Sequence, residues 1–555
     1  MTSPIPIPTE RLTELNLAAK EDGHRIVWSH DTNIFHMTVG KFLSPDQRNK
    51  PAMIFEAPDG TTQVQSFAEI DRQSTNLAAC LRSLGYGRGS FVGLHTGQHP
   101  DTAVAHMAVC KLGAIAVTLS QLYGPDTLLH ALNDCALPVI LTDGNAWGPM
   151  RAHGSDVPHL KHVLSRNPQN GDLDLAEALE TDAPDFLPEF GGADDAALLM
   201  YTSGSTGKPK GILHAHRILA AYTPSIRLFF NLSIDDEDAV FWSPSDWAWV
   251  GGLLDMVFPA WMAGRPIATS LERFNADYAF KFMARHKVTH TFLAPTAIKR
   301  LAQTSAPRDQ YDLSLRVICT GGEALAAETL NWSEVNLGVV CNEFYGMTEV
   351  NHLIGNCAAV FPRRPGSMGR AYPGHEVFLV DGDGIEVKPG DPGEIVTSAS
   401  SPTRFLGYLN NREKDAAIQL GPYLRTYDLA VKDTDGYFWY KGRSDDLIKS
   451  SGFRIGPVEI EECLLSHKDV AEVAAIPKPD TDRGAIVKAF IKLRAGCEGT
   501  DALKTDLADH VRTRLAAYKA PREIEFVDAF ELTSSGKINR RSLRTMEVAK
   551  AEEHR

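Results

Sequence analysis

The chain has 555 residues, which is enough for more than one domain. Its hydrophobic content of 43% and charged content of 23% are ordinary for a globular protein with large cores. The formal net charge of −14 argues against a protein that binds nucleic-acid backbones, and no basic stripe is visible. These figures favour a solvated cytosolic enzyme.

The N-terminal residues 1–8 lack the charged start and the apolar core of a secretory signal, so we expect a cytoplasmic location. The most apolar long stretch, 247–264, is interrupted by Asp255 and Pro259, and we expect no membrane span. Eight cysteines are scattered without C-x-x-C pairs, which excludes the usual zinc spacings and suits a reducing compartment. No metal cluster is expected.

Helices and strands alternate through the first part of the chain. Residues 66–69 form a capping box that opens a helix over 66–84, followed by a strand at 90–94, a helix at 103–112 and a strand at 114–118. This alternation predicts a parallel sheet with helices on both faces. Further short apolar strands are predicted at 139–141, 196–200, 239–241, 289–293 and 315–319.

The pattern of predicted secondary structure changes after residue 364. Short strands separated by turn signals predict an antiparallel β-rich subdomain over about 365–438. A candidate hinge follows at 442–446, and an α+β module comes after it. We therefore expect an α/β fold with two domains: a large N-terminal domain over 1–442, made of layered α/β sheets plus the β-rich subdomain, and a small C-terminal domain over 443–555.

A dense phosphate-handling loop follows the predicted strand 196–200. Residues 201–210 read Tyr-Thr-Ser-Gly-Ser-Thr-Gly-Lys-Pro-Lys. The glycines let backbone N–H groups approach an anion, the hydroxyls add donors, and the lysines supply charge for a departing phosphate. Pro209 stands where a Walker A loop needs Ser or Thr, so this is another kind of nucleotide triphosphate site. The candidate phosphate-binding residues are Thr202, Ser203, Gly204, Ser205, Thr206, Gly207, Lys208 and Lys210.

More motifs follow in a fixed order. Residues 321–324 form a glycine turn after an apolar strand, where a flat base can enter. Residues 342–349 offer an aromatic ring for stacking, the Thr348 hydroxyl for phosphate and the Glu349 carboxylate for a hard cation. Asp428 can accept hydrogen bonds from both hydroxyls of a ribose. Each motif is weak alone, but their order is informative.

With these motifs the chain resembles an acyl-CoA synthetase of the adenylate-forming (AMP-binding) superfamily, in the branch of the acetyl- and medium-chain enzymes. The resemblance covers about residues 66–544. It implies a mobile C-terminal domain and a two-step reaction that joins a carboxylic acid to coenzyme A with ATP and Mg²⁺. No nucleic-acid partner is implied.

The resemblance also implies roles for individual residues. The loop over 202–210 would hold the β- and γ-phosphates, Thr348 would contact the α-phosphate, and Glu349 would bind Mg²⁺. Lys537 would bridge the substrate carboxylate and the α-phosphate during adenylation, and Asp445 would be the hinge. The adenine would be framed by Gly321, Gly322, Glu323 and Ala324 and by Asn342, Glu343, Phe344 and Tyr345, with Gly346 as a further cofactor-binding residue. Asp428 and Arg443 would hold the ribose and phosphate region, Arg454 would flank the hinge, and Gly452 would line the pantetheine tunnel.

Two segments depart from the family pattern. Glu531, Leu532 and Ser534 stand where the family has proline, lysine and arginine, so recognition of Lys537 by an acetyltransferase that reads the proline is in doubt. The usual Thr-Gly-Asp appears here as Thr426-Tyr-Asp428. We expect the aspartate to keep its role.

The acid is less well defined by the sequence. Acetate-specialised relatives have a tryptophan where this chain has Gly346, so the acyl pocket, lined by Trp249, Val250, Gly251 and Gly346, is expected to take a medium-chain or branched aliphatic acid. Alternatively, these glycines serve backbone packing. Asn351 and His352 add polarity that is compatible with a hydroxylated, ether-containing or dicarboxylic acid, although a histidine here is more often structural.

Two other functions remain open. The first is a stand-alone adenylation enzyme that delivers acyl groups to a carrier protein, and it shares the first half-reaction. The second is a nucleotide-binding sensor without catalysis. The segment 450–454 favours a coenzyme A tunnel, and Lys537 with Glu349 favours catalysis.

Overall fold

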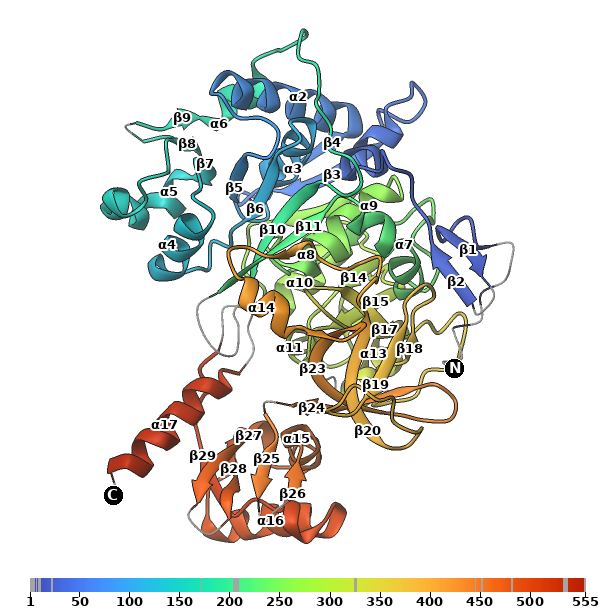
Figure 1. The fold of residues 1–555 in the computed structure, drawn as a ribbon, viewed down its shortest axis with the longest axis vertical. Coiled ribbons are helices and arrows are strands. Elements are labelled where there is room, and N and C mark those ends of the chain that lie inside the picture. The colour runs from blue at the N-terminus through green and yellow to red at the C-terminus, as the bar shows by residue number, and fades with distance from the viewer. Residues whose placement is uncertain are drawn as a thin grey trace. The chain divides into compact units, whose positions relative to one another are not determined.

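The computed structural model divides the chain into two compact units, labelled by element in Figure 1. The first comprises Met1–Val377 and Thr397–Leu424, and the second comprises Phe378–Val396 and Arg425–Arg555. These units come from contacts alone, and the predicted domain boundary between residues 442 and 443 stays a prediction. The structure describes residues 5, 7, 11–20, 23–169, 171–202, 209–323, 327–444, 446–450, 453–480, 483–532 and 538–553.

The first unit contains an eight-stranded sheet in the order β21-β11-β10-β6-β5-β7-β8-β9. Strands β10 to β9 of this order run parallel, whereas β11 and β21 are antiparallel to their neighbours. The strands predicted at 90–94, 114–118, 139–141 and 196–200 are confirmed. Their bounds are β5 (Phe91–His95), β6 (Ile115–Thr118), β7 (Val139–Asp143), β8 (His162–Arg166), β9 (Leu173–Asp174), β10 (Ala196–Thr202), β11 (Lys210–Ala215) and β21 (Gly407–Tyr408).

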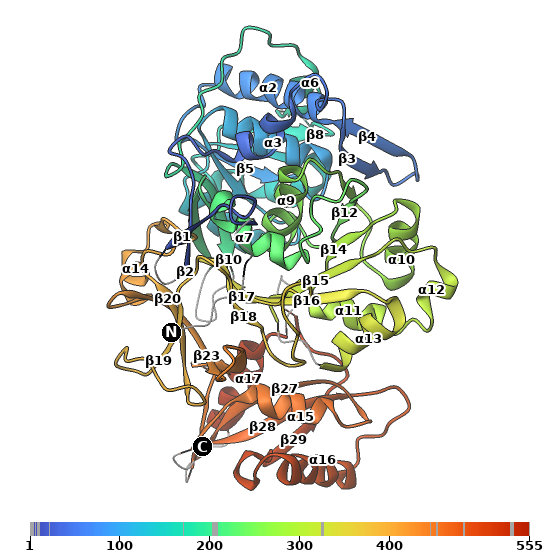
Figure 2. The ribbon, with the colours of Figure 1, turned by 90° about the vertical axis from the view of Figure 1, so that its right-hand side faces the viewer.

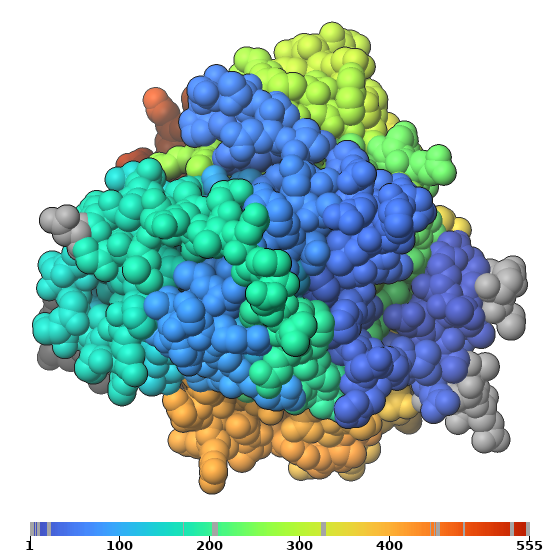
Figure 3. Space-filling view, turned by 90° about the horizontal axis from the view of Figure 1, so that it is seen from above, coloured from blue at the N-terminus to red at the C-terminus, as the bar shows by residue number. Residues whose placement is uncertain are grey.

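Helices α2 (Phe67–Ser83) and α3 (Pro100–Lys111) pack on one another, and α3 contacts β5 and β6. The predicted capping box opens α2: Glu69 N–H donates to Ser66 Oγ at 3.3 Å, and Ser66 N–H donates to Glu69 Oε2 at 2.6 Å. α3 is buried almost all round, which fits its mostly apolar sequence. In Figure 3 the N-terminal segments of the chain, coloured blue to teal, cover much of the face that is turned to the viewer.

A nine-stranded sheet in the order β18-β17-β16-β15-β14-β12-β13-β3-β4 forms the other layer of the first unit. The six strands from β16 to β3 are parallel, so their carboxyl ends share one edge. Figure 2 shows α10 (Ala276–Arg285), α11 (Pro295–Leu301) and α13 (Ala327–Leu337) beside this sheet. The strands are β3 (Pro51–Glu56), β4 (Thr62–Ser66), β12 (Phe241–Trp242), β13 (Ile267–Ser270), β14 (His290–Phe292), β15 (Val317–Gly321), β16 (Val340–Met347), β17 (Asn351–Gly355) and β18 (Arg370–Ala371).

The apolar stretch 247–264 does not form one helix. It is divided into α8 (Val250–Gly252), a π-helix η4 (Leu253–Val257) and α9 (Phe258–Met262). Nearby, α7 (Ile218–Phe229) is buried along its whole length and contacts β16 and β17. Among the helices of the described residues, none combines the length and apolar character needed to cross a bilayer.

The second unit holds a three-stranded sheet of β27 (Val470–Asp480), β28 (Gly484–Leu493) and β29 (Glu523–Phe526). Its helices α15 (Pro457–Leu465), α16 (Asp501–Arg514) and α17 (Arg540–Glu553) complete the predicted α+β module. The buried carboxylate of Glu547, on α17, forms ion pairs with two lysines. Its Oε1 lies 2.8 Å from Lys488 Nζ and 3.1 Å from Lys550 Nζ. Most of the antiparallel strands β19 (Val377–Val380), β20 (Pro392–Ser398), β23 (Tyr423–Lys432) and β24 (Phe438–Arg443) also belong to this unit.

Replacing Ser66 by alanine is expected to destabilise the first unit by about 1 kcal/mol, because the first turn of α2 loses its side-chain acceptor. The change is measured as the shift of the urea midpoint multiplied by the m-value. Ser83→Ala is the control, since that hydroxyl only donates to a carbonyl of its own helix, at Cys80. Equal effects of the two substitutions would contradict the assignment of the cap.

Candidate active site

The phosphate loop is the connection of a β-hairpin. Thr202, at the end of β10, and Lys210, at the start of β11, are register partners across the antiparallel pair. The loop therefore leaves and returns at neighbouring points on the edge where the parallel strands of this sheet end. Its predicted residues Ser203, Gly204, Ser205, Thr206, Gly207 and Lys208 lie outside the described residues.

Helix α4 (Pro125–Asp134) anchors both ends of this loop. On the entering side, the buried Tyr201 hydroxyl donates to Asp134 Oδ2 at 2.9 Å. On the returning side, His130 Nε2 lies 2.8 Å from the Pro209 carbonyl oxygen, as a donor. Burial raises the pKa of Tyr201, so its hydroxyl stays a donor at neutral pH. The positions of the two loop ends are thus fixed by one helix.

A tyrosine that the sequence reasoning missed connects the loop to the predicted magnesium ligand. The Tyr408 hydroxyl donates to Glu349 Oε1 at 2.6 Å, and Lys210 Nζ lies 5.2 Å from the centre of the Tyr408 ring. Tyr408 reaches this position because β21 pairs with β11, with Ile212 as its register partner. Lys210 and Glu349, 139 positions apart in the sequence, are therefore brought to the two sides of one side chain. Only the long-range pairing of β21 reveals this link.

Thr348 and Glu349 lie in the turn that joins β16 to β17. Glu349 is only 8% exposed, and besides Tyr408 its backbone carbonyl accepts from the Phe405 N–H at 2.9 Å. Mg²⁺ prefers oxygen ligands and is usually bound by one or two protein carboxylates together with substrate phosphates. A carboxylate held in a fixed position suits this role. Across the described residues, no group of three or more histidine, cysteine or carboxylate side chains is placed to hold a metal ion. The residues present fit Mg²⁺ held by Glu349 and by nucleotide phosphates.

The predicted adenine-binding segments end two adjacent parallel strands, β15 and β16. Gly321 and Phe344 are register partners, and a Cβ on Gly321 would lie 2.4 Å from the Phe344 ring, so only glycine fits beside that ring. Gly322 has φ of 86° and is exposed, and a Cβ there would meet no atom within 4 Å. Glu323, Glu343 and Tyr345 are also described, whereas Ala324 lies outside the described residues.

Asn342 has a structural task in addition to any role at the nucleotide. Its side chain is fully buried, donates to the Phe229 carbonyl at 3.0 Å and accepts from the Ala358 N–H at 3.3 Å. It thereby ties the end of α7 to the segment that follows β17. Phe344 likewise packs against Phe229, with ring centres 5.0 Å apart. The framing of adenine by these two residues stays a prediction.

The segment that carries Trp249 and Val250 is held between the two sheets of the first unit. The Trp249 ring lies edge-on to Tyr123, with centres 5.7 Å apart, and the Thr118 hydroxyl donates to the Ala248 carbonyl at 2.9 Å. Gly251 faces Phe292, whose ring would lie 2.5 Å from a Cβ at position 251. The segment therefore has a fixed position from which Trp249 and Val250, both half-buried, can line a pocket.

Gly346 has a packing reason for its missing side chain. A Cβ at position 346 would lie 2.0 Å from the backbone oxygen of Asn351, and one at Gly252 would lie 2.4 Å from the backbone oxygen of Ser245. The space that the sequence interpretation assigned to an absent tryptophan is thus occupied, along the Cβ direction of Gly346, by the backbone of β17. A larger residue there requires that backbone to move. The expected medium-chain acid loses this support.

In the second unit, the predicted ribose-binding residues face one another across β23 and β24. Asp428 and Arg443 are register partners, and Arg443 Nη1 lies 3.8 Å from Asp428 Oδ1. The Tyr440 hydroxyl donates to the same oxygen at 3.1 Å. Burial first, and then the Asp428 charge, raise the pKa of Tyr440 well above its usual value, so it remains a donor.

Tyr427 explains how the motif tolerates the loss of its usual glycine. Its φ is 62°, in the left-handed region that favours glycine, at a cost of about 1–2 kcal/mol. The Arg425 guanidinium lies 4.7 Å from the Tyr427 ring centre, and Glu394 accepts from the Tyr427 N–H at 3.1 Å. These contacts hold the strained residue, and Asp428 keeps its place.

Several predicted residues fall where the structure is not described. Asp445, Gly452 and Lys537 lie outside the described residues, and only the backbone of Arg454, in β26 (Phe453–Ile455), is described. Their neighbours are informative: Asp446 forms an ion pair with Arg544 on α17, the helix that begins three positions after Lys537. The hinge, tunnel and catalytic roles of these residues stay predictions.

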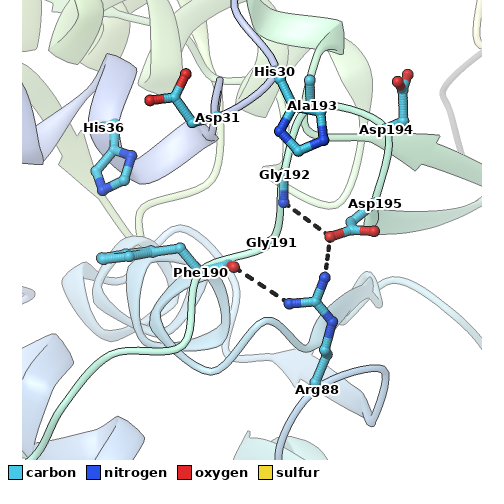
Figure 4. Close-up of a pocket in the computed structure, with 10 residues that line it drawn as sticks. All are labelled: His30, Asp31, His36, Arg88, Phe190, Gly191, Gly192, Ala193, Asp194 and Asp195. Atoms are coloured by element: carbon cyan, nitrogen blue, oxygen red, sulfur yellow. Dashed lines mark hydrogen bonds and ion pairs between the residues drawn. The ribbon is translucent and has the colours of Figure 1, made fainter.

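A separate cavity of about 390 Å³ opens in the first unit, at the start of β10 (Figure 4). Figure 4 shows the Phe190 ring with His36 on one side and the ion pair of Arg88 and Asp195 on the other. β10 has seven residues, so its start is about 20 Å from the phosphate loop at its end. None of the predicted site residues lines this cavity, and it is therefore not the nucleotide site.

Comparison with known proteins identifies the family. The sequence model of the AMP-binding enzyme family matches residues 44–409, and that of the AMP-binding enzyme C-terminal domain matches residues 459–537. The chain belongs to the AMP-binding enzyme family. The resemblance to acyl-CoA synthetases is confirmed: the chain is 32% identical over 527 residues to the acetyl-coenzyme A synthetase of Bacillus subtilis, covering 93% of this chain and 91% of that protein. It is also 32% identical over 522 residues to the mitochondrial acyl-coenzyme A synthetase ACSM4 of Mus musculus, covering 92% and 89%.

Solved structures agree with this assignment. The anthranilate CoA ligase AuaEII, in complex with anthranoyl-AMP, superposes with a TM-score of 0.84 and 29% identity, covering 95% of this chain and 99% of that one. The predicted fold class, with a large N-terminal and a small C-terminal domain, is the architecture of this AMP-binding enzyme family and is confirmed. The enzyme class predicted from the sequence, an AMP-forming acid–thiol ligase, agrees with the names of these relatives.

The Tyr408→Phe substitution is expected to raise the Mg²⁺ concentration needed for half-maximal AMP release by about 10- to 100-fold, because Glu349 loses the group that orients it. AMP release is measured against Mg²⁺ at fixed ATP. Tyr311→Phe is the matched control, since its hydroxyl donates to an exposed carboxylate, Asp277 Oδ1, at 2.9 Å, away from these residues. An unchanged Mg²⁺ dependence would contradict the proposed role of Tyr408.

Proposed function

We propose that the chain is an ATP-dependent acyl-CoA synthetase. It activates a carboxylic acid to acyl-AMP with release of pyrophosphate and then transfers the acyl group to coenzyme A. The observation that supports this most is the joining of Lys210 and Glu349 through Tyr408 in a chain that matches the family along most of its length. Lys210 would supply a positive charge for the departing phosphates, and Glu349 would supply a carboxylate for the metal ion. Both lie next to Tyr408, beside the phosphate loop.

The first step, formation of acyl-AMP, depends more on stabilising negative charge than on proton transfer. A carboxylate is already a nucleophile at neutral pH, so the difficulty is bringing one anion onto another. Lys537 would bridge the substrate carboxylate and the α-phosphate, while Lys208 and Lys210 would stabilise the departing pyrophosphate. Mg²⁺, held by Glu349, supplies charge neutralisation at the phosphates when it is bound. Thr348 would hold the α-phosphate oxygen in line.

The second step uses AMP as the leaving group. The coenzyme A thiol attacks the acyl carbonyl, the acyl–oxygen bond to AMP breaks, and the thiol proton leaves to solvent. Gly452 would line the path of the pantetheine arm, and Asp445 would be the hinge on which the small domain turns between the two steps. In the second unit, Asp428 and Arg443 would hold the ribose in both steps.

For the acid, we keep the medium-chain or branched aliphatic class as the first to test. The supporting features are the segment 245–252 and the relatives named as acyl-coenzyme A synthetases. The relative AuaEII is named for anthranilate, an aromatic amino acid, so aromatic acids belong in the same test. A cytoplasmic location remains a prediction from the sequence. The alternative function is a stand-alone adenylation enzyme that delivers acyl groups to a carrier protein.

One experiment separates these functions. AMP release and coenzyme A consumption are measured together for a panel of acids from acetate to about C12, with aromatic and dicarboxylic acids included. A synthetase consumes one coenzyme A for each AMP released. Acid-dependent ATP–pyrophosphate exchange without consumption of coenzyme A would favour delivery to a carrier protein. ATP–pyrophosphate exchange that is absent with every acid would refute both.

Lys537→Ala is expected to lower the rate of acyl-AMP formation by about 10²–10³-fold, because a charge-bridging contact in the transition state is lost. Thioester formation from pre-made acyl-AMP should be largely spared. Each half-reaction is measured alone. Lys492→Ala is the control, since Lys492 forms a half-exposed pair with Glu472 on the sheet of the second unit. Equal losses in both half-reactions would rule out the assigned role.

A further inference from the structure

A buried polar group lies beside the residues predicted to form the acyl pocket. It consists of Tyr222 on α7, Asp255 in the π-helix η4 and His352 on β17, all fully buried. The Tyr222 hydroxyl donates to Asp255 Oδ1, and His352 Nε2 lies 2.7 Å from the Tyr222 oxygen and 3.3 Å from Asp255 Oδ1. We refer to these three residues as the Tyr222 group.

The position of the Tyr222 group follows from the chain. His352 is the register partner of Gly346 in the β16–β17 hairpin, and Asp255 comes four residues after Gly251. His352 also follows Glu349 by three residues, which corresponds to about 10 Å of extended chain. The Tyr222 group is thus next to the predicted acyl pocket and within the length of a short acyl chain from the turn that would hold the reacting phosphate.

The hydrogen-bond pattern fixes the tautomer of His352. Tyr222 has one proton and donates it to Asp255, so its oxygen can only accept from His352. Asp255 Oδ1 is also an acceptor, so the proton of the imidazole is on Nε2. Burial lowers the pKa of His352, and the ring is therefore neutral at pH 7, with no proton on Nδ1.

Two buried acceptors remain without a partner among the described residues. They are His352 Nδ1, which has no proton in this tautomer, and Asp255 Oδ2. The Tyr372 hydroxyl, on a ring centred 6.1 Å from that of His352, is a donor and is not counted with these acceptors, because it lies against Gly355, where a Cβ would be 1.9 Å from its oxygen. An unpaired buried acceptor is destabilising, so proteins rarely bury one unless water or a ligand donates a hydrogen bond to it.

We propose that the Tyr222 group is a specificity subsite that binds a hydrogen-bond donor, a hydroxyl or amino group, on the acyl part of the substrate. Two acceptors select a donor and repel a second carboxylate or an ether oxygen, which bring only lone pairs. The π-helix that carries Asp255 agrees with this assignment, because such irregular turns are frequent at functional sites. The proposal rests on the proposed synthetase function. It narrows the substrate to a carboxylic acid that carries a hydroxyl or amino group on its acyl part.

The test uses pairs of acids of equal shape. Each pair places a hydroxyl or amino group against a methyl group at the same position, for example 6-hydroxyhexanoate with heptanoate, and 2-aminobenzoate with 2-methylbenzoate. The donor is moved along the chain or ring in further pairs. The kcat/KM ratio of the two members is measured by coenzyme A-dependent AMP release.

We expect the donor member of at least one pair to be preferred by about 100-fold or more in the unmodified enzyme, since a site built to bind such a group rejects an analogue without it. In His352→Leu and Asp255→Asn the ratio should fall to within about tenfold of unity. Asp255→Asn, which turns an acceptor into a donor, should improve the matching methoxy acid relative to the hydroxy acid.

His106→Leu is the matched control, because His106 is also a buried histidine without a partner among the described residues, but it packs on Phe258 and lies outside the Tyr222 group. It should keep the wild-type ratio. If His352→Leu does not fold, judged by its urea midpoint, Asp255→Asn carries the test. An enzyme that is active on the methyl members with no donor preference would overturn the subsite and leave the synthetase function intact; an enzyme inactive on every acid would refute the synthetase function itself.

Discussion

Asn351 adopts a left-handed backbone conformation, with φ of 52°, and this conformation closes the tight hairpin between β16 and β17. Asparagine is among the few residues other than glycine that tolerate it. The hairpin reverses the chain at the carboxyl end of a parallel sheet, where ligands of such sheets bind. Thr348 and Glu349 are placed in its turn, and Gly346 is pressed against the backbone of the returning strand. The site is therefore shaped by backbone as much as by side chains.

Distant segments complete this site through single hydrogen bonds. β21 adds Tyr408 beside Glu349, and α4 holds both ends of the phosphate loop through His130 and Asp134. Each contact involves a buried or half-buried group, so its loss leaves a polar atom without water to replace the partner.

The second unit has its own linked set of charges. Asp428 accepts a hydrogen bond from the Tyr440 hydroxyl and lies opposite Arg443. Glu461 accepts two hydrogen bonds from Arg540, of 2.6 and 3.2 Å. Burial raises the pKa of Glu461, and the Arg540 charge opposes that effect. The Asp446–Arg544 ion pair likewise ties the segment around 446 to α17 within the second unit.

The amino-acid sequence by itself determined the family and most of the order of helices and strands, because these depend on local patterns such as the capping box at Ser66. Its motifs also named the phosphate loop, Asp428 and Glu349 as candidate site residues, and these roles stay predictions. It could not find Tyr408, whose position depends on pairing between β11 and β21, nor the Tyr222 group, whose members are separated by 33 and 97 positions in the chain. It also left open whether Gly346 marks free space or backbone packing, because a missing side chain leaves space only if no other backbone fills it, and the neighbour of Gly346 is decided by strand register. Contacts between distant segments follow from packing of the whole chain, and so only the tertiary structure decided them.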